Sequence, residues 1–238
     1  MSAIIKPPTG IRYYPDLIQG SEEWIAARLG LLTASEMKLI VTPTLKIADN
    51  EKTRAHVYEL AVQRVTEYVE PRYISDDMLR GHEDEVEARL IYHRHYAPVT
   101  EMGFITNDKW GFTLGYSPDG LVGDDGAIEA KSRRQKYHFE NLVEFVPGNA
   151  IHPDYVIQSQ TGLLVSEREW IDHISHSGGL PMSVIRVYPN AKIQEAILAA
   201  SAAFERKVSE KLALYHEVLA SKARLVPTER RVVQEMYV

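Results

Sequence analysis

Apolar side chains recur every three or four residues along several stretches of the chain, which is the spacing of a helix with one buried side. Ser21 followed by two glutamates marks a helix start, because a serine oxygen caps free amides and acidic residues suit the first turn. Ser35 would cap a second helix in the same way, and Pro153 opens a later one. The spacing predicts helices over residues 21–30, 35–40, 57–68, 75–96, 153–164 and 190–222.

Alternating apolar and polar residues, with turn residues between them, predict strands elsewhere in the chain. Residues 1–20 contain several Pro and Gly residues and indicate an irregular arm. Strands over residues 170–175 and 182–188 are expected to form an antiparallel edge pair. Strands over residues 104–106 and 110–114 should lead into a hairpin over residues 115–131.

The hairpin over residues 115–131 carries the candidate chemistry of the chain. Its turn is indicated by Asp124-Asp125-Gly126, because Asp and Gly favour a type I turn followed by a left-handed residue. If these three residues form the loop, Gly123 faces Ala127 and Asp119 faces Lys131. A two-residue loop would shift the register by one and move Asp119 to the other face of the sheet.

Asp119, Glu129 and Lys131 then share one face, because side chains alternate along a strand with a period of two. Two carboxylates suit Mg²⁺ together with water and phosphate oxygens, and a nearby lysine can orient the water that the metal acidifies. The alternative is a surface hairpin with solvated charges, since a short E-x-K pattern also arises by chance. The residues of the opposite face are expected in a core: Val122, Ile128 and Ala130.

The predicted helix over residues 75–96 offers a further carboxylate. Glu85 and Arg89 fall on one face, four residues apart. Glu85 would either form an exposed ion pair with Arg89 or, if this face meets the hairpin, supply a third carboxylate for a metal. The apolar side of this helix is expected to contain Val86, Leu90 and Ile91.

Three other regions hold polar residues that suit a nucleic-acid substrate. Ser35 is either a plain helix cap or, with Arg28, part of a phosphate pocket, because the free amides of a helix start attract anions. The tract over residues 132–136 is the most basic in the chain and is either a solvated turn or a contact for a DNA backbone. Gln158 and Gln160 lie in an otherwise apolar helix, so at least one of them should reach a polar pocket.

Composition and charge narrow the class of protein. With 45% hydrophobic and 25% charged residues, the chain has the composition of an ordinary globular protein. It contains no apolar run of about 18 residues, which excludes a transmembrane helix, and its N-terminus lacks the features of a signal peptide. The absence of cysteine excludes disulfides and fits a reducing cytoplasm. A formal net charge of −6 argues against indiscriminate coating of nucleic acid, although an enzyme can confine its basic residues to a groove.

The sequence shows no repeat, low-complexity tract or linker, which favours a single domain over residues 1–238 that ends in a C-terminal helix and tail over residues 190–238. Its nine histidines lack the H-E-x-x-H spacing of a zinc site, and neither a glycine-rich phosphate loop nor G-x-S-x-G occurs. Metal-assisted chemistry at the hairpin is therefore the one catalytic candidate that several residues of the sequence support.

Six short motifs follow one another between about Ser21 and Pro189. They are Trp24-x-x-x-Arg28-x-Gly30-x-x-Thr33-Ala34-Ser35, Gly81-x-x-x-Glu85-x-x-Ala88-Arg89-x-x-Tyr92, Ser117-Pro118-Asp119-Gly120, Glu129-Ala130-Lys131, Tyr155-x-x-Gln158-x-Gln160 and Trp170-Ile171-Asp172. Each is weak alone, but in this order they are specific. The chain resembles the phage lambda exonuclease family, also called YqaJ-like viral recombinases, within the PD-(D/E)xK nuclease superfamily.

The resemblance implies an α/β (α+β) fold with a restriction-endonuclease-like PD-(D/E)xK core, in which a central mixed β-sheet is flanked by helices. It also implies a Mg²⁺-dependent hydrolase, with Mn²⁺ as a substitute for Mg²⁺. The implied activity is that of a 5′ to 3′ exonuclease, which degrades one strand of linear double-stranded DNA. Its product would be a 3′ single-stranded overhang for phage-type recombination by strand annealing.

The resemblance further implies roles for residues by position. Asp119, Glu129 and the backbone carbonyl of Ala130 would bind Mg²⁺, and Glu85 would assist from its helix. Lys131 would position or activate the attacking water. The other residues carried over are those that line the site, Gln158 and Tyr155, and those that hold the terminal 5′-phosphate, Arg28, Thr33 and Ser35.

The expected partners are linear double-stranded DNA, two further copies of the chain in a homotrimer ring, and a single-strand annealing protein, in the cytoplasm of a bacterial host and without a membrane. A ring would reconcile net acidity with DNA binding, because a basic interior needs no basic exterior. Two alternatives stay open: a site-specific or structure-specific DNA endonuclease of the same superfamily, and a non-catalytic scaffold that binds DNA ends. The presence of Asp119, Glu129 and Lys131 together argues against a non-catalytic scaffold.

The chain departs from the family pattern at two places. Family members often have Cys-Pro after the E-x-K lysine, where this chain has Ser132-Arg133. The strand near Ser175 usually continues with Tyr-Asp-Pro, where this chain has His176-Ser177-Gly178. Neither departure touches the expected metal ligands, but the DNA contacts of these two loops do not carry over.

Overall fold

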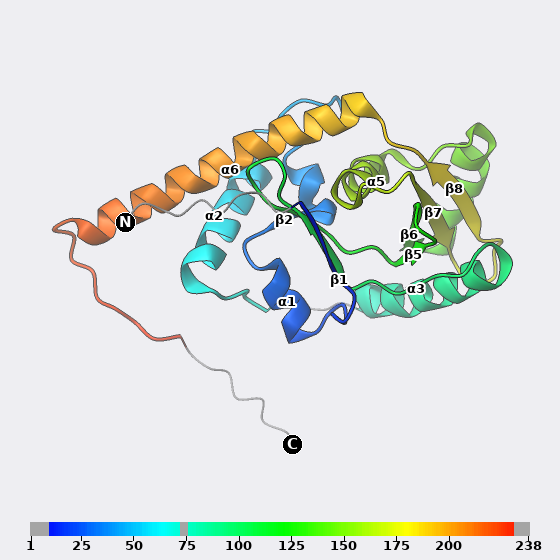
Figure 1. Cartoon of the computed structure of the whole chain (residues 1–238), viewed down its shortest axis with the longest axis horizontal. Coiled ribbons are helices and arrows are strands. Elements are labelled where there is room, and N and C mark those ends of the chain that lie inside the picture. Colours follow the sequence, from blue (N-terminus) through cyan, green and yellow to red (C-terminus); the bar gives the residue numbers. More distant parts are fainter. Residues whose placement is uncertain (1–9, 72–75, 231–238) are drawn as a thin grey trace, which may run out of the picture.

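The strands form two four-stranded sheets in the computed structural model, which describes residues 10–71 and 76–230 (Figure 1). The first sheet has the order β1-β3-β4-β2 and the second β5-β6-β7-β8. In each sheet one pair of strands is parallel, β2 with β4 and β6 with β7, and the other pairs are antiparallel. The strands are β1 (Ile11–Tyr14), β2 (Leu32–Thr33), β3 (Phe104–Asn107), β4 (Leu114–Tyr116), β5 (Gly120–Val122), β6 (Gly126–Ser132), β7 (Trp170–His176) and β8 (Ser183–Val187).

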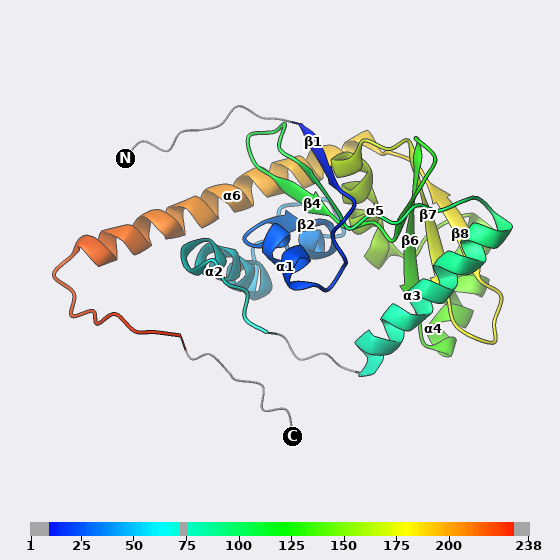
Figure 2. The same ribbon diagram turned by 60° about the horizontal axis from the view of Figure 1, so that its bottom comes forward.

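Helices cover both sheets, as the predicted fold class requires. The helices are α1 (Glu22–Arg28), α2 (Glu51–Thr66), α3 (Asp76–His95), α4 (Gln135–Glu140), α5 (Pro153–Ser166) and α6 (Ala191–Ala220), with the short turns η1 (Ala34–Leu39), η2 (Asn141–Phe145) and η3 (Val146–Gly148). Helix α5 contacts β3 and β4 of the first sheet and β7 of the second, whereas α3 contacts β6 and β7. The long helix α6 lies against α2 and α5 (Figures 1 and 2). Helix α5 therefore connects the two sheets.

Polar caps fix the helix starts. The Ser21 hydroxyl accepts a hydrogen bond from the Trp24 amide at 3.2 Å, which confirms the predicted start of α1. The predicted cap at Ser35 is wrong, because Thr33 precedes the turn η1 and Ser35 lies inside it. The pairing of Thr33 with Gly115 ends β2 at this residue, so the turn begins at once.

The β5–β6 hairpin has a three-residue loop, but the loop consists of Gly123-Asp124-Asp125. Val122 faces Gly126, so the predicted pairing of Gly123 with Ala127 is wrong. Gly123 takes the left-handed φ of 53°, which favours glycine. Gly126 lies within β6, where an added Cβ would come within 2.2 Å of the Trp170 ring. Close packing on Trp170 thus places the turn one residue earlier than predicted.

The corrected register keeps every side chain on its predicted face. Because both ends of the loop move by one residue, the pairing changes by two and the alternation is preserved. Gly120 faces Ile128, which places Asp119 next to Glu129 instead of opposite Lys131. The expected core residues of the other face are indeed buried, together with side chains of α3 and β7: Val122, Ile128 and Ala130.

The buried face of α3 differs from the predicted one. Ala88 and Tyr92 are buried against the second sheet, whereas two of the predicted core residues, Val86 and Leu90, are exposed. The Tyr92 hydroxyl donates a hydrogen bond to Asp172 Oδ2 at 2.6 Å. Because its polar end has a partner, tyrosine can take the core position that an aliphatic side chain was expected to fill.

Three further predictions differ from the structure. Strand β1 lies within the predicted irregular arm, β4 starts only at Leu114, and β7 is an interior strand, so only β8 is an edge of that pair. The first nine residues of the arm, the predicted helix start at Ser75 and the tail beyond Arg230 lie outside the described residues. None of the described helices has both the length and the apolar character needed to cross a membrane.

A shared hydrophobic core fills the space between the sheets and the helices α5 and α6. It contains Leu114 and Tyr116 of the first sheet and Ala127 and Ile171 of the second. The predicted apolar stripe of α6 is buried as far as Val208. That residues 1–238 form a single domain stays a prediction.

Replacing Gly162 with Ala should destabilise the protein, because an added Cβ on α5 would lie 2.7 Å from Tyr116 Cζ and 3.0 Å from Ile171 Cδ1. Overpacking of this kind costs about 1–3 kcal/mol, and urea unfolding would measure it. Gly148→Ala is the matched control, because no atom lies within 4 Å of its Cβ, and its effect should stay within about 0.5 kcal/mol. Equal stability of the two variants would contradict the close packing of α5.

Candidate active site

A buried carboxylate lies in the middle of β6. Glu129 is 1% exposed. It accepts hydrogen bonds from the Tyr116 hydroxyl at 3.0 Å, from Gln158 Nε2 at 2.5 Å and from Lys131 Nζ at 2.6 Å. The donors belong to β4, α5 and β6, so this one carboxylate joins both sheets and the helix between them.

Asp119 lies beside Glu129, between β4 and β5. Its Oδ2 accepts the amide of Ala130 at 2.5 Å. Its backbone carbonyl accepts a hydrogen bond from Arg89 Nη1 of α3 at 3.3 Å, and the carbonyl of the preceding Pro118 accepts one from Gln19 Nε2 at 2.9 Å. The position of this carboxylate is therefore fixed by β6, by α3 and by the segment before α1.

Around Asp119 the carboxylates outnumber the ammonium groups, because Asp119, Glu129 and Glu85 face only Lys131. Burial, together with the charges of Glu129 and Glu85, raises the pKa of Asp119 well above its usual range. Burial lowers the pKa of Lys131, but the charges of Glu129 and Asp119 outweigh it and raise that pKa above its ordinary value. Two adjacent carboxylates with a third nearby form a set of hard oxygen ligands whose charge a divalent cation would offset. The donor set and its charge thus fit such a cation.

Arg28 forms a second polar group beside the carboxylates. Its guanidinium lies 4.1 Å from the centre of the Trp24 ring. It donates hydrogen bonds to Ser117 Oγ and to Thr33 Oγ1, both at 3.1 Å, and Ser35 Oγ lies 3.3 Å from Thr33 Oγ1. The three residues expected to form a phosphate pocket, Arg28, Thr33 and Ser35, therefore lie together.

A cavity of about 190 Å³ joins the two groups. Arg28 and Ser35 line it together with Asp119, Glu129 and Lys131. The other residues in its lining are Gln19, Trp24, Ala34, Tyr116, Ser117 and Gln158. One small molecule with an anionic group can therefore contact the arginine and the carboxylates at once.

Four predicted site residues lie outside the lining of this cavity. Ala130 contacts the site through its amide, which donates to Asp119 Oδ2. Thr33 contacts it only through Arg28 and Ser35. The ring of Tyr155 has its centre 5.8 Å from Lys131 Nζ. Glu85 acts from α3 through its charge, which contributes to the raised pKa of Asp119.

The two glutamines of α5 have different partners. Gln158 reaches the buried Glu129, as expected for at least one of them. Gln160 donates to the carbonyl of Tyr188 at 2.8 Å and accepts the amide of Asn190 at 2.8 Å. Gln160 therefore holds the connection between β8 and α6, away from the cavity.

Several residues at the site were missed in the sequence. Tyr116 and Ser117 directly precede the predicted Pro-Asp motif, which was a usable signal. Gln19 lies in a segment with turn residues and carried no signal. His173 is buried beside Tyr155, with ring centres 5.2 Å apart, and burial lowers its pKa to about 3. It is therefore a neutral side chain near Lys131.

The fold belongs to the restriction-endonuclease-like PD-(D/E)xK class, with mixed sheets flanked by helices. Residues 23–169 match the YqaJ-like viral recombinase domain, and the chain belongs to this family. A comparison with curated proteins found no match.

Solved structures show the same relationship. An alkaline exonuclease (LHK-Exo) from Laribacter hongkongensis is 30% identical, with 84% of this chain and 98% of that chain covered and a TM-score of 0.73. A structure of LHK-Exo in complex with dAMP gives 31% identity, 83% and 100% coverage and a TM-score of 0.68. A phage related exonuclease from Haemophilus somnus, 12% identical with a TM-score of 0.53 over 78% of this chain and 96% of that chain, shares the fold.

Replacing Asp119 with Asn should stabilise the metal-free protein at alkaline pH. The raised pKa means that the folded state holds a proton that the unfolded state releases above about pH 4. The contribution of Asp119 to stability is thus fully present below that pH and is lost as the pH rises through its folded-state pKa. We expect a higher Tm for Asp119→Asn at pH 8 in EDTA, by about 2–4 °C for each kcal/mol gained in the free energy of unfolding. The difference in Tm between the variant and the wild type should narrow toward pH 4.

The exposed Asp124 of the hairpin loop provides the control. Asp124→Asn should leave the Tm close to that of the wild type at both pH values. A Tm for Asp119→Asn that falls below the wild type at pH 8 would contradict the excess of negative charge around Asp119.

Proposed function

We propose that this protein is a Mg²⁺-dependent 5′ to 3′ exonuclease that acts on linear double-stranded DNA and leaves 3′ single-stranded overhangs. The observation that carries the proposal is the cavity that joins Arg28 and Ser35 to Asp119, Glu129 and Lys131. An end-dependent nuclease must hold a terminal phosphate and place the next phosphodiester beside its carboxylates. Family membership and the 30% identity to an alkaline exonuclease support the same activity.

Asp119, Glu129 and the carbonyl of Ala130 would hold the cation. Bound Mg²⁺, or Mn²⁺ in its place, would acidify a water molecule and neutralise charge on the phosphoryl group. The hydrogen bonds from Tyr116 and Gln158 keep Glu129 in place for this task. Glu85 would add charge from α3.

Lys131 would act as a cation, because its pKa lies above the ordinary value and it holds its proton at neutral pH. Its side chain is 22% exposed, and its ammonium donates to Glu129 at 2.6 Å. From there Lys131 would orient the attacking water and stabilise the charge that develops on the phosphoryl oxygens. Tyr155 lies beside this ammonium and would keep it in place.

Arg28 would bind the terminal 5′-phosphate, with Ser35 as a second contact. The Thr33 hydroxyl donates to Glu36 Oε2 at 2.8 Å and accepts from Arg28 at 3.1 Å. Because a hydroxyl has one hydrogen to donate, Thr33 has none left for a phosphate. Thr33 would therefore orient Arg28, and the contacts to the phosphate would come from Arg28 and Ser35.

The proposed product is a 5′-mononucleotide. LHK-Exo, to which this chain is similar, has been solved in complex with dAMP. A terminal phosphate at Arg28 and cleavage at Asp119 would release one nucleotide at a time from the 5′ end. The opposite strand would remain as the substrate of a single-strand annealing protein in recombination.

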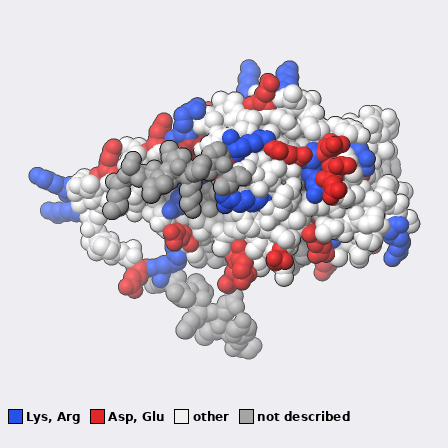
Figure 3. Space-filling view, viewed as in Figure 1, with Lys and Arg blue, Asp and Glu red and all other residues white. Residues whose placement is uncertain are grey.

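DNA would reach the site through a local basic surface. Acidic and basic side chains are mixed on the face shown in Figure 3, and the chain carries 33 acidic against 27 basic residues. Arg133 and Lys136, in the basic tract that follows β6, lie over the ring of Tyr137 at 5.7 and 4.6 Å. This tract would meet the phosphate backbone next to the carboxylates.

The remaining proposals concern organisation. Residues 1–238 would form a single nuclease domain, and three copies would form a ring around the DNA in the cytoplasm of a bacterial host. Exposed apolar side chains at the far end of α6, Leu214, Val218 and Leu219, support a contact between copies. Sedimentation would give the mass of the assembly.

Digestion of four substrates tests the activity. In Mg²⁺, linear duplex with 5′-phosphate should be degraded to mononucleotides, linear duplex with 5′-hydroxyl more slowly, and covalently closed duplex and single strands little. EDTA should stop the reaction. Degradation of closed and linear DNA at equal rates would exclude end dependence, discrete cuts in the closed circle would indicate an endonuclease, and Mg²⁺-independent binding without nucleotide release would indicate a scaffold.

Lys131→Ala should lower kcat by at least about 100-fold, because it removes the cation from the reacting phosphate. DNA affinity, measured by fluorescence anisotropy with Ca²⁺ in place of Mg²⁺, should stay within a few-fold of the wild type. The exposed Lys46, in a loop before α2, provides the control, and Lys46→Ala should change neither quantity. Normal turnover by Lys131→Ala would remove this residue from the mechanism.

A further inference from the structure

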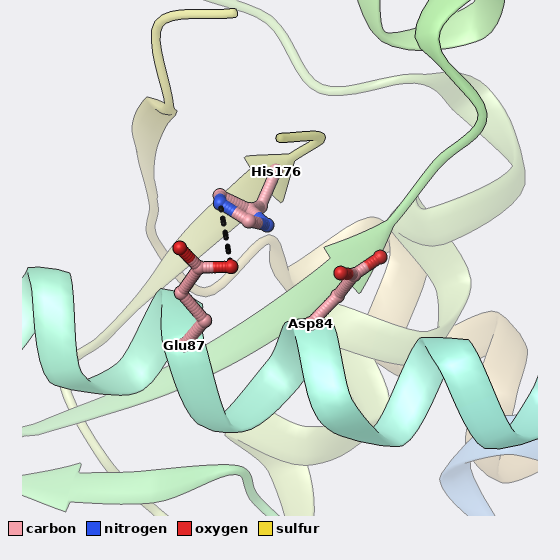
Figure 4. A group of neighbouring side chains, drawn as sticks. All are labelled: Asp84, Glu87 and His176. Carbon is pink, nitrogen blue, oxygen red and sulfur yellow. Dashed lines mark ion pairs between the residues drawn. The ribbon is translucent and has the colours of Figure 1, made fainter. Parts of the chain in front are cut away.

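A second group of metal-type side chains lies between α3 and the ends of β6 and β7 (Figure 4). Asp84 and Glu87 are three residues apart on α3 and therefore share a side of the helix. His176 is the last residue of β7. One ligand atom from each of the three lies within 4.8 Å of the others.

This cluster lies on the face of the second sheet opposite Glu129. His176 pairs with Ser132, and both have the parity of Ala130, which faces α3, whereas Glu129 and Lys131 face α5. The cluster is therefore separated from the cavity described above by β6 itself. Its residues have no role in the proposed nuclease reaction.

His176 is the observation that points to a ligand. It is 3% exposed, and its Nδ1 has no hydrogen-bond partner among the described residues. Its Nε2 faces Glu87 Oε2 at 3.9 Å, which is too far for a hydrogen bond (Figure 4). Among the described residues neither nitrogen of this buried imidazole has a hydrogen-bond partner, which requires an explanation. A cation between Nε2 and the carboxylates would give Nε2 its partner.

The surroundings of Asp84 suit a ligand role. Asp84 Oδ2 accepts a hydrogen bond from the Ser132 hydroxyl, which orients the carboxylate as an outer-shell donor does in metal sites. Arg80 forms an ion pair with Asp84 at 3.7 Å, but its side chain is 43% exposed and can leave for water. The two departures from the family pattern, at Ser132 and His176, both contribute to this cluster.

We propose that Asp84, Glu87 and His176 form a binding site for a transition-metal cation of the Zn²⁺ class, with water in the remaining position. An imidazole with two carboxylates favours Zn²⁺ over Mg²⁺, which selects oxygen alone. Two ligands on a tetrahedral ion at about 2.1 Å lie about 3.4 Å apart. The 3.9 Å between His176 and Glu87 needs only a small rotation of the Glu87 side chain, which is 61% exposed.

Co²⁺ titration of the full chain tests the site, with visible absorption as the readout and Zn²⁺ as competitor. The Asp119→Asn variant serves as background, and millimolar Mg²⁺ is present, so that the proposed nuclease site does not contribute. We expect one Co²⁺ per chain, displaced by Zn²⁺ and not by Mg²⁺. Failure of nuclease activity would leave this result untouched, because the readout is independent of turnover.

Two charge-matched variants separate a site from general attraction. Glu87→Gln should weaken Co²⁺ binding on the order of ten-fold or more, whereas Glu195→Gln, an exposed glutamate on α6, should leave it unchanged. Because Glu87 is exposed, its substitution should not disturb folding, unlike that of the buried His176. Equal affinities of the two variants, or no Co²⁺ binding in the Asp119→Asn background, would show a plain ion pair and overturn the proposal.

Discussion

Burial of the Glu129 carboxylate requires hydrogen-bond donors for both of its oxygens, because an unpaired buried charge is strongly destabilising. The donors are Tyr116 at the end of β4, Gln158 on α5 and Lys131 on the same strand as the acid. The first sheet, the second sheet and α5 must therefore reach their final arrangement before this charge is satisfied. The same contacts that hold the fold together place the carboxylate, so the candidate site is as rigid as the core around it.

The charge that remains after these contacts explains why the site suits a cation. Lys131 offsets one carboxylate, but Asp119 is also buried and lies within the influence of Glu85. A protein without a function for Asp119 would gain stability from a neutral residue there, since burial of like charges is unfavourable. A buried Asp at this position is the pattern of a site in which stability is lost in exchange for binding a cation, and the neighbouring Arg28 would attract a second, negatively charged group.

The sequence predicted the parts of this site that depend on local rules. Alternation placed Asp119 on the face of Glu129 and Lys131 even though the turn was one residue late, because a shift of two leaves the faces unchanged. The contact of Tyr116 with Glu129 was not predictable in this way, since it arises only when two sheets meet. Helical spacing identified α3 but not its buried side, because the partner that lets Tyr92 be buried is Asp172, 80 residues away.

Helix α3 links the two faces of the second sheet. Asp84 contacts the end of β6 through Ser132, while the next residue, Glu85, acts on Asp119, and Arg89 one turn further holds the Asp119 carbonyl at 3.3 Å. A cation that joined α3 to the end of β7 would fix the position of the helix along the sheet. Because the groups that set the charge and the position of Asp119 belong to that helix, occupation of one face would restrict the geometry of the other without any contact between the two sites.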